Sequence, residues 1–155
     1  MKHWPAILLV EDEAGDAFVF QEALRGSSIP AQLQRVSDGL MAIEYLKGEG
    51  QYSNRQTHPL PGLVVLDLSM PGLDGISLLR WIRKQPWLHG LPVVVFTCND
   101  EGSFVAEAME SGADTYIIKG RETRDLLRLL GQVDLNWKAR NRPLPPSSGS
   151  SACVP

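Results

Sequence analysis

The stretch GLVVLD, residues 62–67, is an apolar run that ends abruptly in an acidic residue, Asp67. Two other stretches have the same form, AILLVED at 6–12 and YIIK at 116–119. Short, continuously apolar runs are typical of strands that are buried on both faces of a parallel sheet. Ligands bind outside the carboxyl ends of such strands, where the charged residues of all three stretches fall. The sequence therefore predicts a ligand site that combines carboxylates with a lysine.

Strand-like and helix-like segments alternate along the chain. Apolar residues at helical spacing follow each strand-like run, and the last helix is expected from about Thr123. This alternation predicts an α/β fold, with a parallel sheet and helices on both of its faces. The second run is rich in polar residues, so we expect it at an edge of the sheet. The expected strands are 6–10, 31–36, 62–66, 92–96 and 115–118.

Two segments are expected to lack regular structure. The polar stretch from Gly48 to Pro61 has the composition of a surface loop. Residues 141–155 form a tail rich in proline and serine, which cannot bury enough apolar surface to order itself. We therefore expect one folded domain over residues 1–140, since a chain of 155 residues leaves no room for a second one.

The composition argues against several classes of protein. A formal net charge of −3 argues against a dedicated nucleic-acid surface, which carries a basic excess. No apolar run approaches the roughly 20 residues that cross a bilayer, so no membrane segment is expected. Cys98 and Cys153 give no disulfide framework, and the three histidines lack metal-ligand spacing. We expect a soluble protein of the reducing cytoplasm.

The acidic residues at the strand ends are suited to accept a phosphoryl group with the help of Mg²⁺. This ion binds a few carboxylates and keeps water and phosphate oxygens as its other ligands. Asp12 and Asp67 would supply two oxygens, and Glu11 would act directly or through water. The backbone carbonyl of Ser69 would be in reach if the loop after the third strand curls back. Asp67 would then be the nucleophile that forms an aspartyl phosphate.

Two further residues complete this predicted site. Lys119 would neutralise a phosphoryl oxygen as a compact positive charge. Thr97, just past the fourth expected strand, would donate its hydroxyl group to another oxygen. Taken singly, an acid at a strand end is more often a helix cap, and a lysine is more often a surface charge. The joint placement of these residues at the ends of four strands is what indicates a site.

Four motifs make the chain resemble the receiver domains of two-component response regulators, over about residues 5–138. The resemblance implies a doubly wound, flavodoxin-like α/β fold, with a five-stranded parallel sheet in the order 2-1-3-4-5 and five helices. It also implies a module that accepts a phosphoryl group from a histidine kinase and signals by changing conformation, rather than an enzyme. The motifs are LLVED (8–12), VLDLSMPGLDG (65–75), VFT (95–97) and GADTYIIK (112–119).

The resemblance also implies roles for individual residues. The signal would leave through the face formed by the helix that Gly112 closes, the strand 115–118 and the helix from Thr123. Leu127 and Leu129 lie off the main apolar stripe of that last helix. They either pack on the sheet or lie singly exposed, or they form a patch for self-association, of which a homodimer through this face is the favoured form. The implied roles are phosphoacceptor for Asp67, Mg²⁺ ligands for Glu11 and Asp12, switch pair for Thr97 and Lys119, and aromatic switch for Tyr116.

Some positions depart from the family pattern. Lys119 is followed by Gly120, where the family usually has a proline joined by a cis bond. A cis bond without proline costs about 2.5–4 kcal/mol, so the sequence leaves open whether this bond is cis. Cys98 stands where smaller residues are common. Ser69 and Asn99 would border the water that attacks the acyl phosphate, and the direction of their effect on its lifetime stays open.

A narrower resemblance points to a partner. The segments EDEAGD (11–16) and GEGQY (48–52), with the helix end near Trp137, are similar to regulators that serve bacterial phytochrome kinases. The implied partner is therefore a histidine kinase, and more narrowly one of the phytochrome type. The phosphoryl group would then pass to a histidine on a downstream phosphotransfer protein, or to water.

Two other functions stay open at this point. A Mg²⁺-dependent phosphatase with an aspartyl nucleophile commonly has a second Asp two residues later, where this chain has Ser69. It also needs a substrate-binding cap, for which no segment is large enough. A degenerate receiver would act only as an interaction adaptor, although the intact acidic residues, Thr97 and Lys119 argue against that function. Glycine motifs for binding nucleotides do not occur.

Overall fold

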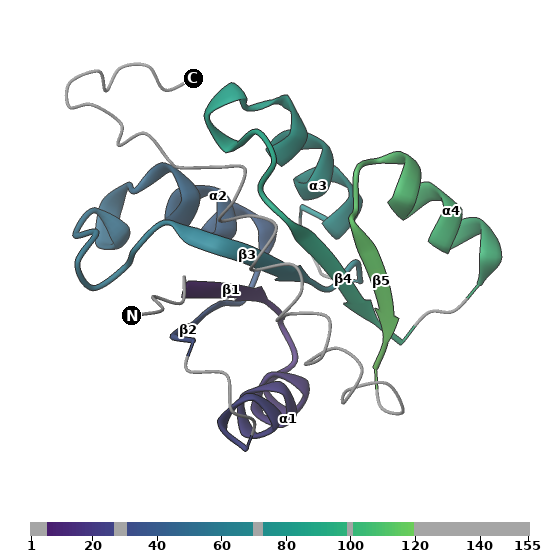
Figure 1. The fold of residues 1–155 in the computed structure, drawn as a ribbon, viewed down its shortest axis with the longest axis horizontal. Coiled ribbons are helices and arrows are strands. Elements are labelled where there is room, and N and C mark those ends of the chain that lie inside the picture. The colour runs from purple at the N-terminus through teal and green to yellow at the C-terminus, as the bar shows by residue number, and fades with distance from the viewer. Residues whose placement is uncertain (1–5, 27–30, 70–72, 99–100, 120–155) are drawn as a thin grey trace.

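Five parallel strands form a single sheet in the order β2-β1-β3-β4-β5 (Figure 1). The computed structural model describes residues 6–26, 31–69, 73–98 and 101–119. The expected α/β class, strand order and edge position of β2 are confirmed. The expected fifth helix, the tail 141–155 and the Lys119–Gly120 bond lie outside the described residues. The strands are β1 Ala6–Val10, β2 Leu33–Val36, β3 Pro61–Leu66, β4 Val93–Thr97 and β5 Thr115–Ile118.

Four α-helices connect the strands within the described ranges. Asp38 and Asp74 cap α2 and α3, each accepting a backbone N–H bond at 2.8 Å. The first helix begins at Ala14, earlier than its apolar spacing suggests, because the Glu13 carboxylate accepts from the backbone N–H of Gly15. None of the described helices has the length and apolar character needed to cross a membrane. The helices are α1 Ala14–Arg25, α2 Gly39–Lys47, α3 Gly75–Lys84 and α4 Gly102–Glu110.

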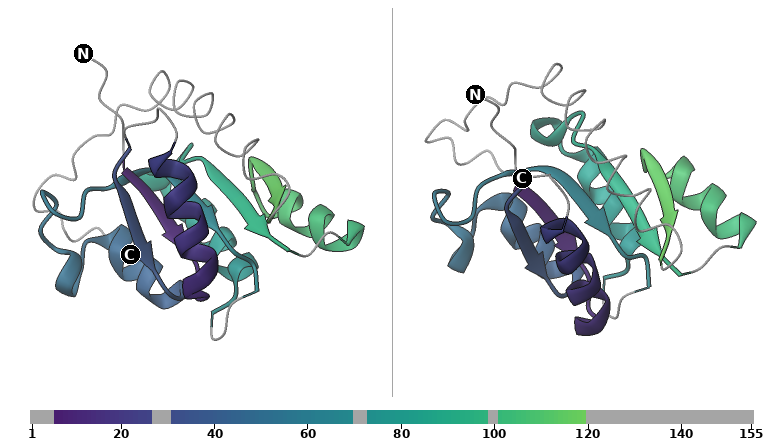
Figure 2. Two further views of the ribbon diagram at one scale, coloured as in Figure 1. Left: turned by 90° about the horizontal axis from the view of Figure 1, so that it is seen from below. Right: turned by 60° about the horizontal axis from the view of Figure 1, so that its bottom comes forward.

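The helices cover both faces of the sheet, as the alternation predicts. Helix α1 packs on one face, and α2, α3 and α4 lie on the other (Figures 1 and 2). On the α1 face, Phe20 meets Phe96 edge to face at 5.7 Å between ring centroids. On the opposite face, Leu8, Val64 and Val95 are fully buried against the other helices. Burial on both sides explains why the central strands read as continuous apolar runs.

The stretch from Gly48 to Pro61 is largely exposed, as expected of a surface loop, but part of it packs against the core. It contains a short 3₁₀ helix, Gly50–Tyr52, whose last side chain is buried against the core. Arg55 donates hydrogen bonds to the carbonyl groups of Tyr45 and Leu46 at 2.9 and 2.7 Å, at the end of α2. The bond to Leu46 provides a partner for a carbonyl group at the helix end, while the Tyr45 carbonyl also accepts from the Gly48 N–H at 3.0 Å. This polar segment therefore supplies the side chain that caps the end of α2.

Pairing of the two central strands brings the predicted acidic residues to one edge. Val10 pairs with Leu66, and the backbone N–H of Asp67 donates to the carbonyl of Val10 at 3.1 Å. Gly75, the first residue of α3, packs directly against the residues that follow β3. A Cβ atom at Gly75 would lie 2.5 Å from the Cα of Leu68 and 2.7 Å from the carbonyl oxygen of Asp67. Only glycine permits this approach, which fixes the start of α3 beside the site.

Candidate functional site

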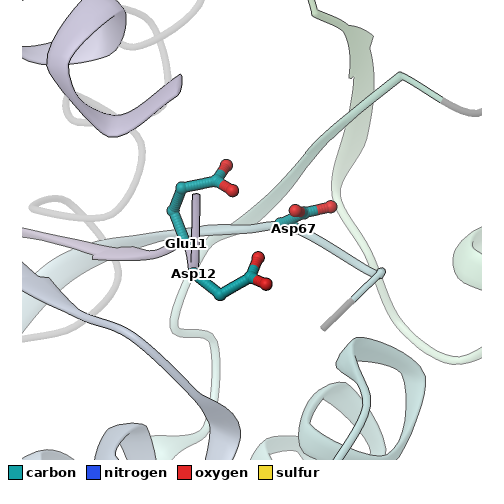
Figure 3. Close-up of side chains that lie close together, drawn as sticks. All are labelled: Glu11, Asp12 and Asp67. Atoms are coloured by element: carbon teal, nitrogen blue, oxygen red, sulfur yellow. The ribbon is translucent and has the colours of Figure 1, made fainter. Parts of the chain in front are cut away.

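Glu11, Asp12 and Asp67 form a compact cluster at the carboxyl ends of β1 and β3 (Figure 3). Each contributes a carboxylate oxygen, and these oxygens all lie within 4.8 Å of one another. The side chains of Glu11 and Asp67 are buried, whereas Asp12 is exposed. The cluster is therefore anchored in the sheet and open to solvent on the side of Asp12.

Backbone amides orient the two buried carboxylates. The N–H of Ser69 donates to Asp67 Oδ1 at 3.1 Å. The N–H of Glu13 donates to Glu11 Oε2 at 3.2 Å. Each carboxylate keeps its second oxygen for another partner.

Lys119 supplies the positive charge of the site. Its Nζ atom lies 2.8 Å from Glu11 Oε1 and 3.2 Å from Asp67 Oδ2, and its side chain is only 12% exposed. The backbone N–H of Lys119 donates to the carbonyl oxygen of Thr97 at 2.9 Å, which ties the end of β5 to the end of β4. The lysine predicted from the last strand therefore reaches the carboxylates of the first and third.

Burial and neighbouring charge shift the ionisation of this cluster. Burial raises the pKa of Glu11 from 4.5 to about 7; Lys119 opposes the increase, and the charge of Asp67 adds to it. Burial by itself would lower the pKa of Lys119. The hydrogen bond to Asp16, with the Glu11 and Asp67 carboxylates, instead raises this pKa above its ordinary value of 10.5. Shifts of this kind are typical of functional clusters.

The donor set fits a hard divalent cation. Such ions bind carboxylate oxygens, and the cluster offers several of them on one open side. Among the described residues, Glu11 Oε1 is the buried side-chain oxygen that lacks a hydrogen bond. Lys119 Nζ lies 2.8 Å from it and forms an ion pair with it. A buried, incompletely paired carboxylate oxygen is suited to a metal ligand.

Asp16 is a site residue that the sequence interpretation missed. It lies in the first turn of α1, and its Oδ2 atom accepts a hydrogen bond from Lys119 Nζ at 2.8 Å. Asp12 lies before α1, so helical spacing does not connect Asp16 with the acidic pair. The contact itself joins residues 103 positions apart, which local patterns do not reveal.

Arg35 is the second residue that was missed. From strand β2, its Nε donates to the carbonyl oxygen of Glu11 at 3.0 Å, and its Nη2 donates to that of Asp12 at 3.3 Å. The guanidinium group therefore holds the backbone of both acidic residues. No local pattern indicates this role, because an arginine in an edge strand is usually a solvated charge.

The other predicted site residues occupy distinct surroundings. Thr97 is fully buried at the end of β4. Tyr116, in β5, is half-buried and packs against the core on the face covered by α2, α3 and α4. Ser69 and Cys98 are exposed beside the ends of β3 and β4. Asn99 lies outside the described residues.

Comparison with known proteins identifies the class of this chain. Residues 7–130 match the model of the family described as "Response regulator receiver domain". The response regulator Rcp1 of Synechocystis sp. is 36% identical over 131 residues, which cover 84% of this chain and 87% of Rcp1. The chain therefore belongs to the response regulator receiver domain family.

Solved structures agree with this assignment. The Mn²⁺-bound form of Rcp1 matches with a TM-score of 0.70 and 33% identity, covering 91% of this chain and 99% of Rcp1. The phosphorylated cyanobacterial phytochrome response regulator RcpA matches with a TM-score of 0.73 and 31% identity, covering 90% of this chain and 98% of RcpA. The bacteriophytochrome response regulator RtBRR matches with a TM-score of 0.75 and 31% identity, covering 92% of this chain and 86% of RtBRR. The protein is thus a phosphoacceptor signalling module with an acidic pocket, and not a classical enzyme.

Proposed function

We propose that Asp67 is the phosphoacceptor and that Glu11, Asp12 and Asp67 hold the divalent cation that phosphorylation requires. One observation carries this assignment: Asp67 Oδ2 lies 3.2 Å from Lys119 Nζ, while its carboxylate also belongs to the acidic cluster. A nucleophile needs both an oxygen free to attack and positive charge beside the incoming group. Glu11 also contacts Lys119, but Asp67 directly follows β3, the strand that lies between β1 with its two acids and β4 with Thr97.

The proposed step transfers a phosphoryl group from a phosphohistidine. An oxygen of the Asp67 carboxylate forms a bond to phosphorus while the phosphorus–nitrogen bond breaks, and the imidazole leaves with the electron pair and takes a proton from water. Charge spreads over the phosphoryl oxygens during this transfer, so positioning and charge neutralisation dominate catalysis. Lys119 supplies one positive charge, and the buried Thr97 hydroxyl is proposed to donate to another phosphoryl oxygen.

Mg²⁺ is the proposed cation, because it binds through a few carboxylates together with phosphate oxygens. When bound, it would neutralise the phosphoryl oxygens. Glu11 and Asp12 would hold it from β1, Asp67 from β3, and the backbone carbonyl of Ser69 is the proposed fourth protein ligand. The hydrogen bond from the Ser69 N–H to Asp67 supports this last assignment.

We further propose that Thr97 and Tyr116 carry the signal away from the site. Thr97 would move toward the phosphoryl group, and the half-buried Tyr116 ring would follow it inward. Activation then shifts a population between two packings, biased by contacts that only the phosphorylated form makes. Ser69, Cys98 and Asn99 are the proposed modifiers of the lifetime of the acyl phosphate.

The proposed partner is a histidine kinase, and more narrowly a kinase of the bacterial phytochrome type. The resemblance to RcpA and RtBRR, which are both described as phytochrome response regulators, supports this narrower assignment. Histidine kinases transfer the phosphoryl group of ATP, so the cytoplasm is the proposed location. The receiver would span residues 1–140, with 141–155 as a tail, and the family match over 7–130 supports that extent.

Self-association and onward transfer complete the proposal. We expect a homodimer through the face of α4, β5 and the segment expected to form a fifth helix. On the described part of this face, the Met109 side chain of α4 is 43% exposed, which suits a contact surface. The phosphoryl group would then pass to a histidine of a downstream phosphotransfer protein, or be lost to water.

Labelling with a small phosphodonor tests the assignment of Asp67. The protein is incubated with acetyl phosphate and Mg²⁺, and intact mass spectrometry records the addition of one phosphoryl group. Wild type should gain the group, whereas Asp67→Asn should not. Asp74→Asn is the matched control, because asparagine caps a helix as well as aspartate does and Asp74 caps α3 nearby. Labelling of Asp67→Asn at the wild-type rate would overturn the proposal.

A further inference from the structure

Lys119 has three carboxylate neighbours, and one of them stands apart from the acidic cluster. Its Nζ atom lies 2.8 Å from Glu11 Oε1, 2.8 Å from Asp16 Oδ2 and 3.2 Å from Asp67 Oδ2. Glu11 and Asp67 belong to the group of acids that can hold a metal, and Asp16 does not. The ammonium group donates hydrogen bonds to Asp16 Oδ2 and Asp67 Oδ2 and forms an ion pair with Glu11 Oε1.

A bound cation or phosphoryl group would weaken the contacts of Glu11 and Asp67 with Lys119. A divalent cation would draw on the Glu11 and Asp67 carboxylates, and phosphorylation would convert one Asp67 oxygen into an ester-like oxygen. Both acids would then be weaker acceptors for Lys119, since their negative charge is shared. Asp16 would keep its full carboxylate charge, because neither the cation nor the phosphoryl group uses it.

The fold holds Asp16 and Lys119 in place from separate elements. Asp16 is in the first turn of α1, where the Glu13 side chain caps the helix and the N–H of Ala17 donates to the Glu13 carbonyl at 3.0 Å. Lys119 follows β5 and is tied to Thr97 through its backbone. The Lys119 side chain is 12% exposed and the Asp16 side chain is 44% exposed. The pair is therefore more constrained than an exposed surface ion pair.

We propose that Asp16 is a positioning residue for phosphoryl transfer: it keeps the Lys119 ammonium directed at the site while the other two acids are engaged. This inference rests on the proposed roles of Asp67 and Lys119. The lysine then needs no rearrangement of its long side chain when the phosphoryl group arrives, because one partner persists throughout. A preoriented charge of this kind stabilises a transition state more than a mobile charge does.

A double-mutant cycle tests the inference on the full chain. Phosphorylation by acetyl phosphate at saturating Mg²⁺ is timed for wild type, Asp16→Asn, Lys119→Ala and the double variant. Asp16→Asn should slow phosphorylation about tenfold, a loss common when a group that orients a functional side chain is removed. In the Lys119→Ala background the same change should have no further effect, because coupled residues are not additive. Asp16→Glu, which keeps the charge, should recover most of the rate.

The controls separate positioning from other effects of Asp16. Glu22→Gln removes the same charge from an exposed position of the same helix, where Glu22 pairs with Arg25 and not with Lys119, and it should leave the rate unchanged. The Mg²⁺ dissociation constant of Asp16→Asn should stay within about twofold of wild type, since Asp16 is not among the clustered acids. An Asp16→Asn rate equal to or above the wild-type rate would overturn the inference, as would an equal slowing in the Lys119→Ala background. Failure of wild type to accept the group, or labelling of Asp67→Asn, would overturn the proposed function itself.

Discussion

Glu11 binds its proton more tightly in the folded chain than in the unfolded one. Burial raises its pKa from 4.5 to about 7. Below pH 4.5 both states hold the proton, whereas between 4.5 and 7 the unfolded state releases it and the folded state retains it. In the absence of metal, the free energy of unfolding should therefore fall by up to about 3 kcal/mol as the pH rises from 4.5 to 7. The raised pKa of Lys119 acts only at higher pH and does not enter this window.

Denaturant unfolding as a function of pH measures this effect. Without metal, Glu11→Gln should flatten the decline of the free energy of unfolding between pH 4.5 and 7, because an amide has no proton to lose in this range. Glu22→Gln on the exposed side of α1 is the control, and its pH profile should follow wild type. A Glu11→Gln profile that falls as steeply as wild type would show that another group causes the decline.

Gly75 should tolerate no side chain. Gly75→Ala would place a Cβ atom 2.5 Å from the Cα of Leu68, so α3 or the loop after Asp67 must shift. Overpacking of this kind destabilises by roughly 1–3 kcal/mol, and we expect slower phosphorylation as well, since Asp67 moves with the loop. Gly102→Ala in α4 is the matched control, because a Cβ there meets nothing within 4 Å. Equal free energies of unfolding for the two variants would contradict the assigned role of Gly75.

Strand β2 supports the acidic loop through Arg35. Because Arg35 binds the carbonyl oxygens of Glu11 and Asp12, Arg35→Ala should loosen the backbone that carries both acids. We expect the Mg²⁺ dissociation constant to rise about tenfold, as is common when an outer partner of a metal ligand is lost. Isothermal titration calorimetry measures this change. Arg25→Ala, in an exposed ion pair with Glu22, is the control and should bind Mg²⁺ as wild type does; equal affinities for both variants would exclude the supporting role.

The elements could be predicted from the sequence because their signals are local. Apolar runs marked the strands, and Asp38 and Asp74 marked the starts of two helices. The acids and the lysine followed from the same local pattern, since carboxyl ends of parallel strands share one edge. The contacts of Tyr52 and Arg55 were not predicted, because the polar composition of their segment does not reveal a buried ring or a bond to a helix end. Asp16 and Arg35 act through contacts between distant segments, which single-sequence patterns do not encode.

At the level of the whole chain, metal binding and folding should be coupled. The clustered acids repel one another until a cation neutralises them, and the unfolded chain cannot assemble the cluster. Mg²⁺ at 100 times its dissociation constant should therefore stabilise the fold by about 2.7 kcal/mol. Thermal unfolding should show a midpoint that rises with Mg²⁺ concentration. NaCl at matched ionic strength is the control and should give a much smaller change.

The variant Asp12→Ala separates this coupling from general charge screening. It removes one clustered acid that is exposed and outside the core, so the fold should persist without metal. The Mg²⁺-dependent rise of the unfolding midpoint should largely disappear. A rise as large as that of wild type would place the stabilising cation elsewhere on the molecule.

The most direct test of the central claim is to locate the phosphorylated residue. The protein is phosphorylated with acetyl phosphate and Mg²⁺ and then reduced with borohydride, which converts an aspartyl phosphate into homoserine. Peptide sequencing by mass spectrometry then reads the position of that homoserine. The account predicts homoserine at position 67 and at no other aspartate. Homoserine at position 12 or 16, or none after verified phosphorylation, would contradict it.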